Sequence, residues 1–170
     1  MGTAMTLNVD IEPIWSEIDA LGHRARTYLE AQGLERHTVD ALTMVLRELA
    51  ENATKYGVFD GGGRIAVSLQ VTPRDVVIEV RNPVGEGNDE HLRRLDRMIQ
   101  RIRGYQDPFE VYFDRLREVS GQRLDSRESG LGLVRIAYEG QSVLDFYVDD
   151  HDTLAVSAMF RRPGKDDHAN

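Results

Sequence analysis

Alternation of apolar and polar residues along this chain predicts five β-strands. Residues 6–12 place Leu7, Val9 and Ile11 at every second position, which is the period of a half-buried strand. Four later runs form two pairs, and each pair is separated by a short polar segment typical of a hairpin turn. These runs are residues 64–71 with 75–81, and residues 142–148 with 153–161. The paired runs predict a mixed or antiparallel sheet.

Apolar residues at helical spacing predict the helices. One helix is expected from Pro13 to about residue 32, ended by Gly33, and a longer one over residues 35–56, ended by Gly57. Further helical stripes follow at Leu92, Leu95, Ile99 and Ile102 and, in a shorter helix, over residues 109–119. Strands paired in one layer and helices covering one of its faces give a two-layer α/β sandwich, which is the predicted fold class.

The helix expected over residues 35–56 has two chemically different faces. Glu48, Asn52 and Lys55 lie at positions i, i+4 and i+7, so their side chains share one stripe. The opposite stripe is apolar and should face a core, with Leu42, Val45, Leu46, Leu49 and Ala53 as its members. A carboxylate, an amide oxygen and an ammonium group in register suit a nucleotide with its Mg²⁺. A solvated polar face is the alternative, so the argument needs a second motif.

The second motif is a glycine-containing loop that leads into an apolar helical segment at residues 128–137, with the sequence Glu-Ser-Gly-Leu-Gly-Leu-Val-Arg-Ile-Ala. Such a loop leaves backbone N–H groups open at a helix N-terminus, where the helix dipole favours an anion. Alone, a pair of glycines before a helix is often only a tight turn. The two motifs together are much more specific for a phosphate-containing ligand.

The first motif resembles the N-box, and the second resembles the last glycine box, of the ATP-binding fold shared by gyrase, Hsp90, histidine kinases and MutL. Within that group the short chain is similar to the anti-sigma-factor serine kinases of bacterial partner switches. The resemblance covers about residues 5–162 and implies a Bergerat-type sandwich that binds ATP and Mg²⁺. It also implies a nucleotide lid at about residues 88–128.

The resemblance implies a role for each matching residue. Glu48 would be the catalytic base or its helper, Asn52 would ligate Mg²⁺, and Lys55 would contact phosphate. Tyr56 would flank the nucleotide. The loop that wraps the phosphates would be formed by Ser129, Gly130, Leu131, Gly132 and Leu133. Arg127 stands close enough in sequence to reach the phosphates, with a solvated loop position as the alternative.

The middle box of the family departs from its usual form here. Asn82 follows the strand of residues 75–81 at the place where the family carries an aspartate that accepts a hydrogen bond from adenine. An asparagine amide oxygen still accepts such a bond, without the added strength that a charge gives. Val84 replaces a glycine, Gly85 is shifted by one place, and Glu128 stands where a first glycine is common.

Composition limits the function classes. The net charge of −8 and pI of about 5.1 argue against a nucleic-acid-binding surface. The chain has no cysteine, which fits a reducing cytoplasm, and no apolar run approaches the ~20 residues of a membrane span. We expect one domain over residues 1–162 and a flexible tail over 163–170. Lys55 is one of two lysines among 21 basic residues, so its place in the motif adds weight to a phosphate contact.

These observations favour a cytoplasmic serine/threonine protein kinase that uses Mg-ATP and phosphorylates a small STAS-type partner, an anti-sigma-factor antagonist. A homodimer is also compatible with the resemblance. The main alternative is a degenerate, non-catalytic member that keeps the fold and binds a protein, which the changes at Asn82 and Glu128 favour. A detached ATPase domain of a histidine kinase is a weaker alternative, because Arg24 follows His23 where a phosphoaccepting histidine has a carboxylate.

Overall fold

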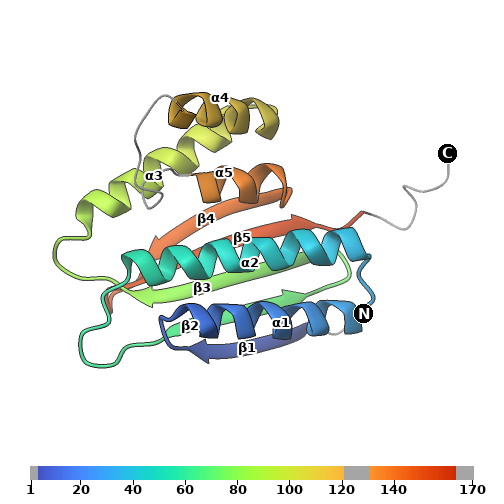
Figure 1. Ribbon diagram of the computed structural model, residues 1–170, viewed down its shortest axis with the longest axis horizontal. Helices are drawn as coiled ribbons and strands as arrows, with labels where there is room; N and C mark the ends of the chain where they lie inside the picture. The colour runs from blue at the N-terminus through green and yellow to red at the C-terminus, as the bar shows by residue number, and fades with distance from the viewer. Residues whose placement is uncertain (1–3, 121–130, 164–170) are drawn as a thin grey trace.

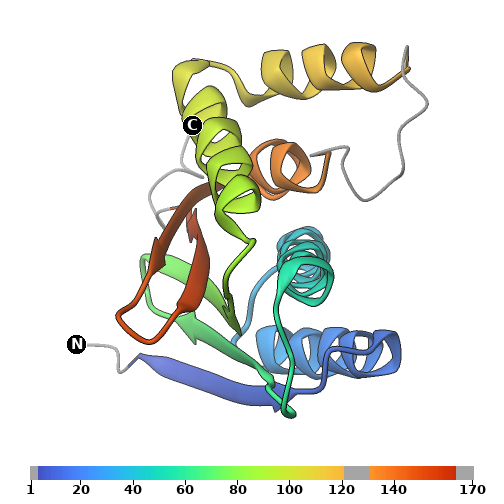
Figure 2. The ribbon, with the colours of Figure 1, turned by 90° about the vertical axis from the view of Figure 1, so that its left-hand side faces the viewer.

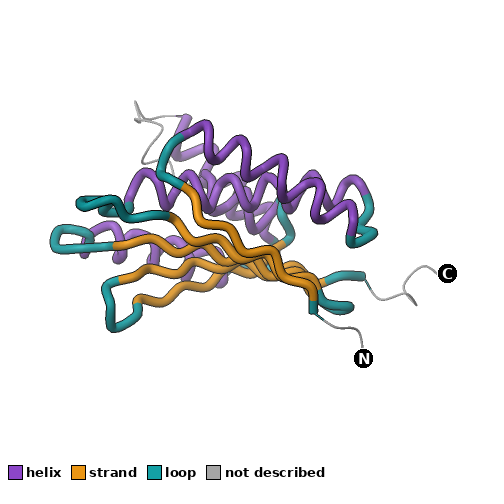
Figure 3. Tube along the Cα trace, turned by 90° about the horizontal axis from the view of Figure 1, so that it is seen from below, coloured by secondary structure: helices purple, strands orange, loops and turns teal. Residues whose placement is uncertain are grey.

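The computed structural model describes residues 4–120 and 131–163, and they form an α/β sandwich. A five-stranded sheet has the order β1-β2-β3-β5-β4, and every neighbouring pair is antiparallel. The helices lie on one face of the sheet, as the two side views show (Figures 2 and 3). The predicted fold class is therefore confirmed, with a sheet that is wholly antiparallel.

The elements follow one another as Figure 1 shows. In chain order they are β1 (Met5–Ile11), α1 (Trp15–Ala31), α2 (Arg36–Tyr56), β2 (Ile65–Val71), β3 (Asp75–Pro83), α3 (Asp89–Gly104), α4 (Pro108–Ser120), α5 (Leu131–Tyr138), β4 (Ser142–Val148) and β5 (Thr153–Arg161). None of the helices in the described part of the chain is long and apolar enough to cross a membrane.

The core lies between the sheet and helices α1 and α2. Strand β2 alternates completely, because its four apolar residues Ile65, Val67, Leu69 and Val71 are buried and the residues between them are not. The apolar stripe of α2 is buried against this layer, from Leu42 at 1% exposure to Ala53 at 5%. Full burial of a leucine or isoleucine side chain contributes about 1.5–3 kcal/mol, so this face holds α2 against the sheet.

Two element boundaries differ by two residues from those that the sequence predicts, and several others differ by one. Helix α1 begins at Trp15 rather than Pro13, because the preceding Ile14 has an extended backbone with φ −130° and ψ 150°. Strand β3 continues through Asn82 to Pro83, where the prediction ended it at residue 81. Asparagine and proline are typical turn residues. Here, pairing with β5 overrides that preference, with Asn82 opposite Leu154 in the register.

Helices α3, α4 and α5 form a second group of helices beside α2. Helix α3 rises obliquely from the end of β3, and α4 lies above α3 and α5 (Figures 1 and 2). Leu95 and Ile99 are buried, while Leu92 and Ile102 pack against the core from partly buried positions. The predicted apolar stripe on this helix is therefore confirmed, and it fixes α3 as one wall of a cavity beside α2.

We predict that Gly140→Ala destabilises the fold. Gly140 follows α5, and a Cβ atom at this position would overlap Val45 Cγ2 and lie 2.5 Å from the Ile136 carbonyl oxygen. Overpacking of this kind costs about 1–3 kcal/mol in the free energy of unfolding, which urea denaturation measures. Gly104→Ala is the control, because a Cβ there meets nothing within 4 Å. Equal stability of the two variants would contradict the prediction.

Candidate active site

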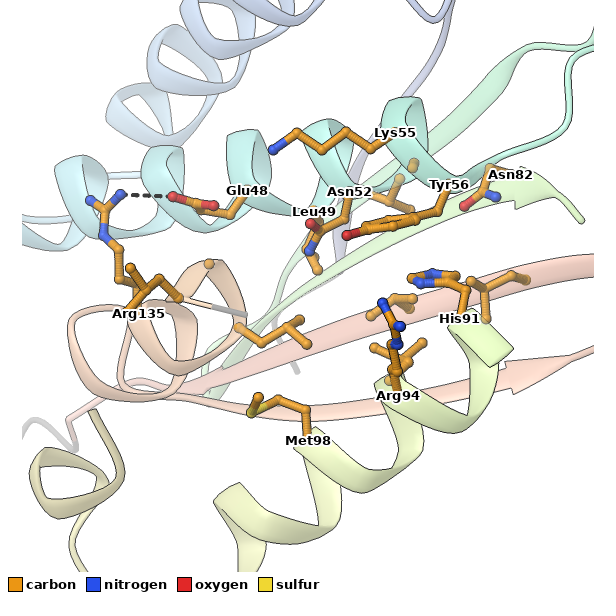
Figure 4. Close-up of a pocket in the computed structure, with 18 of the residues that line it drawn as sticks. Glu48, Leu49, Asn52, Lys55, Tyr56, Asn82, His91, Arg94, Met98 and Arg135 are labelled. Atoms are coloured by element: carbon orange, nitrogen blue, oxygen red, sulfur yellow. Dashed lines mark hydrogen bonds and ion pairs between the residues drawn. The ribbon is translucent and has the colours of Figure 1, made fainter. Parts of the chain in front are cut away.

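A cavity of about 700 Å³ lies among α2, α3 and α5 and the adjoining strands β3 and β5. Val80 of β3 and Leu154 and Val156 of β5 form an apolar floor. Polar and charged side chains from the three helices line the walls (Figure 4). An apolar floor with a few convergent polar groups is the usual form of a small-molecule site.

Helix α2 supplies the wall that the sequence pattern predicts. Glu48, Asn52 and Lys55 all line the cavity, together with Tyr56 at the end of the helix. Figure 4 shows Asn52 between Glu48 and Tyr56, and Lys55 extending back along α2 toward Glu48. The burial of the apolar stripe of α2 sets this orientation, because residues on the opposite side of the helix then face the cavity.

Glu48 forms an ion pair with Arg135 of α5. The Arg135 Nη1 donates to Glu48 Oε1 at 2.7 Å, and the Glu48 side chain is 18% exposed. Burial raises the pKa of the Glu48 carboxyl above its ordinary value, while Arg135 and Lys55 lower it. A Cβ atom on Gly132 would lie 2.5 Å from Glu48 Oε2, so only glycine at this position allows the carboxylate to rest against the start of α5.

Tyr56 stacks on His91 of α3 at the other end of the cavity. The ring centroids are 3.8 Å apart and the planes differ by 11°. Burial, assisted by the charge of Arg94, lowers the pKa of His91 to about 4, so the imidazole is neutral at neutral pH. Asn88 Nδ2 donates to the Tyr56 carbonyl oxygen at 2.7 Å, which ties the start of α3 to the end of α2.

Asn82 lies on β3 at the same end of the cavity as Tyr56 and His91 (Figure 4). Asn82 is only 2% exposed, and its Nδ2 donates to the Pro83 carbonyl oxygen at 3.1 Å. The amide oxygen of Asn82 is the acceptor that the sequence predicts for an adenine amino group. Asn82 thus lines the cavity, and its role as an adenine acceptor stays a prediction.

Arginine side chains form the wall opposite α2. Arg94, Arg97 and Arg101 line the cavity from α3, and Arg115 does so from α4. Glu118 binds two of them, with distances of 2.6 Å to Arg101 and 2.8 Å to Arg115. Hydrogen bonds from these two guanidinium groups lower the pKa of Glu118 to about 2. A chain with net charge −8 thus gathers positive charge around one cavity, which favours an anionic ligand.

Sequence reasoning missed several of these cavity residues. The spacing of Arg94, Arg97 and Arg101 at i, i+3 and i+7 is a signal that could have identified one basic face of α3. Arg135 lies one turn of helix beyond Leu131, so it also shared a face with the glycine motif. Only the packing of α5 against α2 shows that this face meets Glu48. No local sequence pattern marks His91, because its stacking partner Tyr56 lies on a different helix.

The remaining predicted residues divide into three groups. Leu131, Gly132 and Leu133 line the cavity at the start of α5, as expected for the end of the glycine box. Gly85 is not among the described residues that line it, and its N–H instead donates to Asn88 Oδ1 at 3.2 Å in the loop before α3. The predictions for Arg127, Ser129 and Gly130 fall outside the described residues.

The chain's own ligands fit a magnesium ion only if a nucleotide supplies the others. Asn52 offers an amide oxygen at the cavity wall, one turn from the Glu48 carboxylate. Residues 4–120 and 131–163 contain no group of three or more histidine or acidic side chains placed to hold a metal. Mg²⁺ commonly binds through one or two protein ligands together with phosphate oxygens and water. The donor set therefore fits Mg²⁺ delivered with a nucleotide.

Comparison with known proteins supports the fold. No family model matches the chain, and no curated protein matches it. Among solved structures, a chain in the crystal structure of the SiaB–SiaC complex from Pseudomonas aeruginosa is similar, with a TM-score of 0.69 and 21% sequence identity. The similarity covers 91% of this chain and 88% of that chain. It extends over nearly the whole sandwich, so the arrangement of sheet and helices is one that occurs in a solved protein.

We predict that His91 makes stability depend on pH. The folded-state pKa of about 4 lies below the ordinary value of 6.5, so the unfolded chain binds the proton first as pH falls. Stability is therefore present above about pH 6.5 and is lost progressively toward about pH 4. The loss attributable to His91 between about pH 7 and about pH 5 is at most about 2 kcal/mol, reduced by partial solvent exposure.

Urea unfolding of the wild-type chain and His91→Phe at both pH values measures this loss. Phenylalanine keeps a ring stacked on Tyr56 and cannot take up a proton. We expect the variant to lose less stability than the wild type on acidification. Equal losses in the two proteins would show that His91 does not carry the effect.

Proposed function

We propose that this chain is a protein kinase that transfers the γ-phosphate of Mg-ATP to a serine or threonine of a small regulatory protein. The observation that carries the proposal is the cavity wall on which Glu48, Asn52 and Lys55 lie together, facing an arginine-rich wall over an apolar floor. The resemblance of the two sequence motifs to anti-sigma-factor kinases gives this geometry its interpretation. The similarity of fold to a chain of the SiaB–SiaC complex is consistent with it.

The two ends of the cavity suit the two ends of a nucleotide. Asn82, Tyr56 and the neutral His91 lie at one end and offer an amide and flat rings to a base (Figure 4). Glu48 and Arg135 lie at the other end, with Asn52 between the two. Lys55 and the α3 arginines supply positive charge for phosphates. A bound nucleotide would thus place its terminal phosphate near Glu48.

Phosphoryl transfer depends mainly on positioning and on neutralising charge. Mg²⁺ bound with the nucleotide would neutralise phosphate charge, with Asn52 as its ligand from the chain. The acceptor hydroxyl oxygen forms a bond to the γ-phosphorus, and the bond from that phosphorus to the β–γ bridging oxygen breaks, releasing ADP. Glu48 takes the hydroxyl proton. Lys55 and the arginines stabilise the negative charge on the transferring group.

We infer that the protein substrate is a small partner of the STAS type, as in partner switches that the sequence resembles. The structurally similar chain comes from a complex of two proteins, SiaB and SiaC. A second protein bound near the mouth of the cavity would bring its hydroxyl group to Glu48. Such a partner must present a serine or threonine hydroxyl on a small folded domain.

A protein-binding module without catalysis is the second candidate. The observation that favours it is the ion pair that already engages Glu48 with Arg135 at 2.7 Å. A carboxylate held in this way has a structural role in joining α2 to α5. In this case the cavity binds nucleotide weakly or not at all, and the fold serves to present a surface to another protein.

We predict that Asn52→Ala weakens Mg-ATP binding and abolishes phosphotransfer without changing the fold. Calorimetric titration with Mg-ATP measures the binding, and transfer from labelled ATP to a purified STAS-domain protein measures the activity. Loss of one oxygen ligand for Mg²⁺ should weaken binding by about tenfold or more. Asn8→Ala is the matched control, because Asn8 is exposed on β1. We expect the control to behave as the wild type.

The outcomes separate the two candidate functions. Micromolar binding that Asn52→Ala loses supports the nucleotide site, and transfer to the STAS domain supports the kinase. Transfer that survives in Asn52→Ala would contradict the assigned role of Asn52. No heat from the wild type at millimolar Mg-ATP would overturn the kinase proposal in favour of the binding module.

A further inference from the structure

The ion pair between Glu48 and Arg135 joins two segments that are 87 residues apart in the chain. Arg135 also contacts Glu139, which follows α5, with Nη2 and Nε donating to Glu139 Oε2 at 3.2 and 3.4 Å. One guanidinium group therefore bridges two carboxylates. Its planar fork fixes the direction of each bond, which a lysine ammonium does not do.

Glu48 is held on two sides by α5. Arg135 binds Oε1, and Oε2 occupies the space that a side chain at position 132 would fill. The Glu48 side chain is 18% exposed, so water supplies little of its solvation. The contacts with α5 thus set where this carboxylate points, and Arg135 opposes the effect of burial, which raises the pKa of the Glu48 carboxyl.

We propose that Arg135 is the positioning residue for Glu48: it keeps the carboxylate ionised and directed along the cavity wall, where Glu48 can take the proton of an acceptor hydroxyl. This inference rests on the proposed kinase function. Three of the five N–H donors of Arg135 engage Glu48 and Glu139, so we assign this guanidinium to the two carboxylates and not to the transferring phosphate. The role differs from that of Lys55 and the α3 arginines, which are assigned to the phosphates.

The other charges around Glu48 show why Arg135 matters. Glu51 of α2 and Glu139 beyond α5 raise the pKa of the Glu48 carboxyl, as burial does. Lys55 of α2 lowers it, but its influence is smaller than that of Arg135. Arg101 and Arg115, on the opposite wall, are bound to Glu118. Removing Arg135 therefore leaves Glu48 with its main opposing charge gone, and its carboxyl should protonate at higher pH.

The first experiment titrates the Glu48 carboxyl by ¹³C NMR in the complete chain without nucleotide, with Glu48→Gln to assign the signal. We expect the midpoint to move to higher pH in Arg135→Met than in the wild type. Arg135→Lys, which keeps the charge, should stay close to the wild type. Arg24→Met removes the same charge from an exposed position on α1 and should leave the midpoint unchanged. An unchanged midpoint in Arg135→Met would overturn the inference.

The second experiment measures transfer from Mg-ATP to the STAS-domain protein over a range of pH. We expect kcat of Arg135→Met to fall about tenfold or more, a part of the ~10²–10⁴-fold that a positioned general base supplies. The KM for Mg-ATP should stay within about twofold. The acidic limb of the kcat profile should move to higher pH, because the base must be ionised. A raised KM with unchanged kcat would instead make Arg135 a phosphate ligand and overturn the inference.

The two experiments distinguish failure of the kinase proposal from failure of the Arg135 inference. If the wild-type chain transfers no phosphate, the kinase proposal falls, while the titration still decides whether Arg135 controls the charge of Glu48. If the wild type is active and the titration midpoint does not move, the kinase stands and the Arg135 inference falls. Circular dichroism of each variant checks that it is folded, and Arg135→Gln, which also removes the charge, replaces Arg135→Met if that variant does not fold.

Discussion

The burial of one face of α2 against the sheet is the constraint on which the rest of this structure depends. Leu42, Leu46 and Leu49 are each at most 2% exposed, and each contributes about 1.5–3 kcal/mol through burial. A helix held in this way has little freedom to rotate about its axis, because rotation would expose these side chains and bury charged ones. The polar stripe of α2 is thereby directed to the cavity, and the position of the candidate site follows from the packing of the core.

Two long-range ties then give the cavity its two different ends. At one end the Tyr56 ring stacks on His91, and Asn88 bonds the last turn of α2. At the other end Glu48 forms an ion pair with Arg135, which lies 87 residues later in the chain. Helices α3 and α5 are therefore fixed to the same wall from opposite ends. The space between them has a ring-lined end, where the His91 imidazole is neutral, and an end with the Glu48–Arg135 ion pair. A nucleotide likewise has a flat base at one end and charged phosphates at the other.

The sequence predicts the layers of this fold well because each layer has one dominant period. Strand β2 alternates without exception, and the hairpin of β4 and β5 has the predicted bounds. The prediction was wrong at the end of β3. The local turn preferences of Asn82 and Pro83 do not reveal that these residues pair with β5 in the sheet. For the same reason the pattern indicates the α2 wall, which is local, but not the partnership of Glu48 with Arg135 or of Tyr56 with His91. Those contacts exist only when segments distant in sequence are packed together.

The charged side chains of the cavity affect both the kind of ligand that it favours and the ionisation of the Glu48 carboxyl. Lys55, Arg135 and the α3 arginines create a positive region in a chain whose net charge is −8. The surrounding negative charge opposes extended polyanions, whereas a small anion that fits inside experiences mainly the local positive groups. Two of these groups, Arg135 and Lys55, act on Glu48, whose burial alone would favour the protonated acid. Positive charge that attracts phosphate therefore also favours the ionised form of a carboxylate beside it. A base and an anion-binding site can share this cavity because Arg135 pairs with Glu48, while Lys55 lines the same wall and favours both the ionised carboxylate and a bound anion.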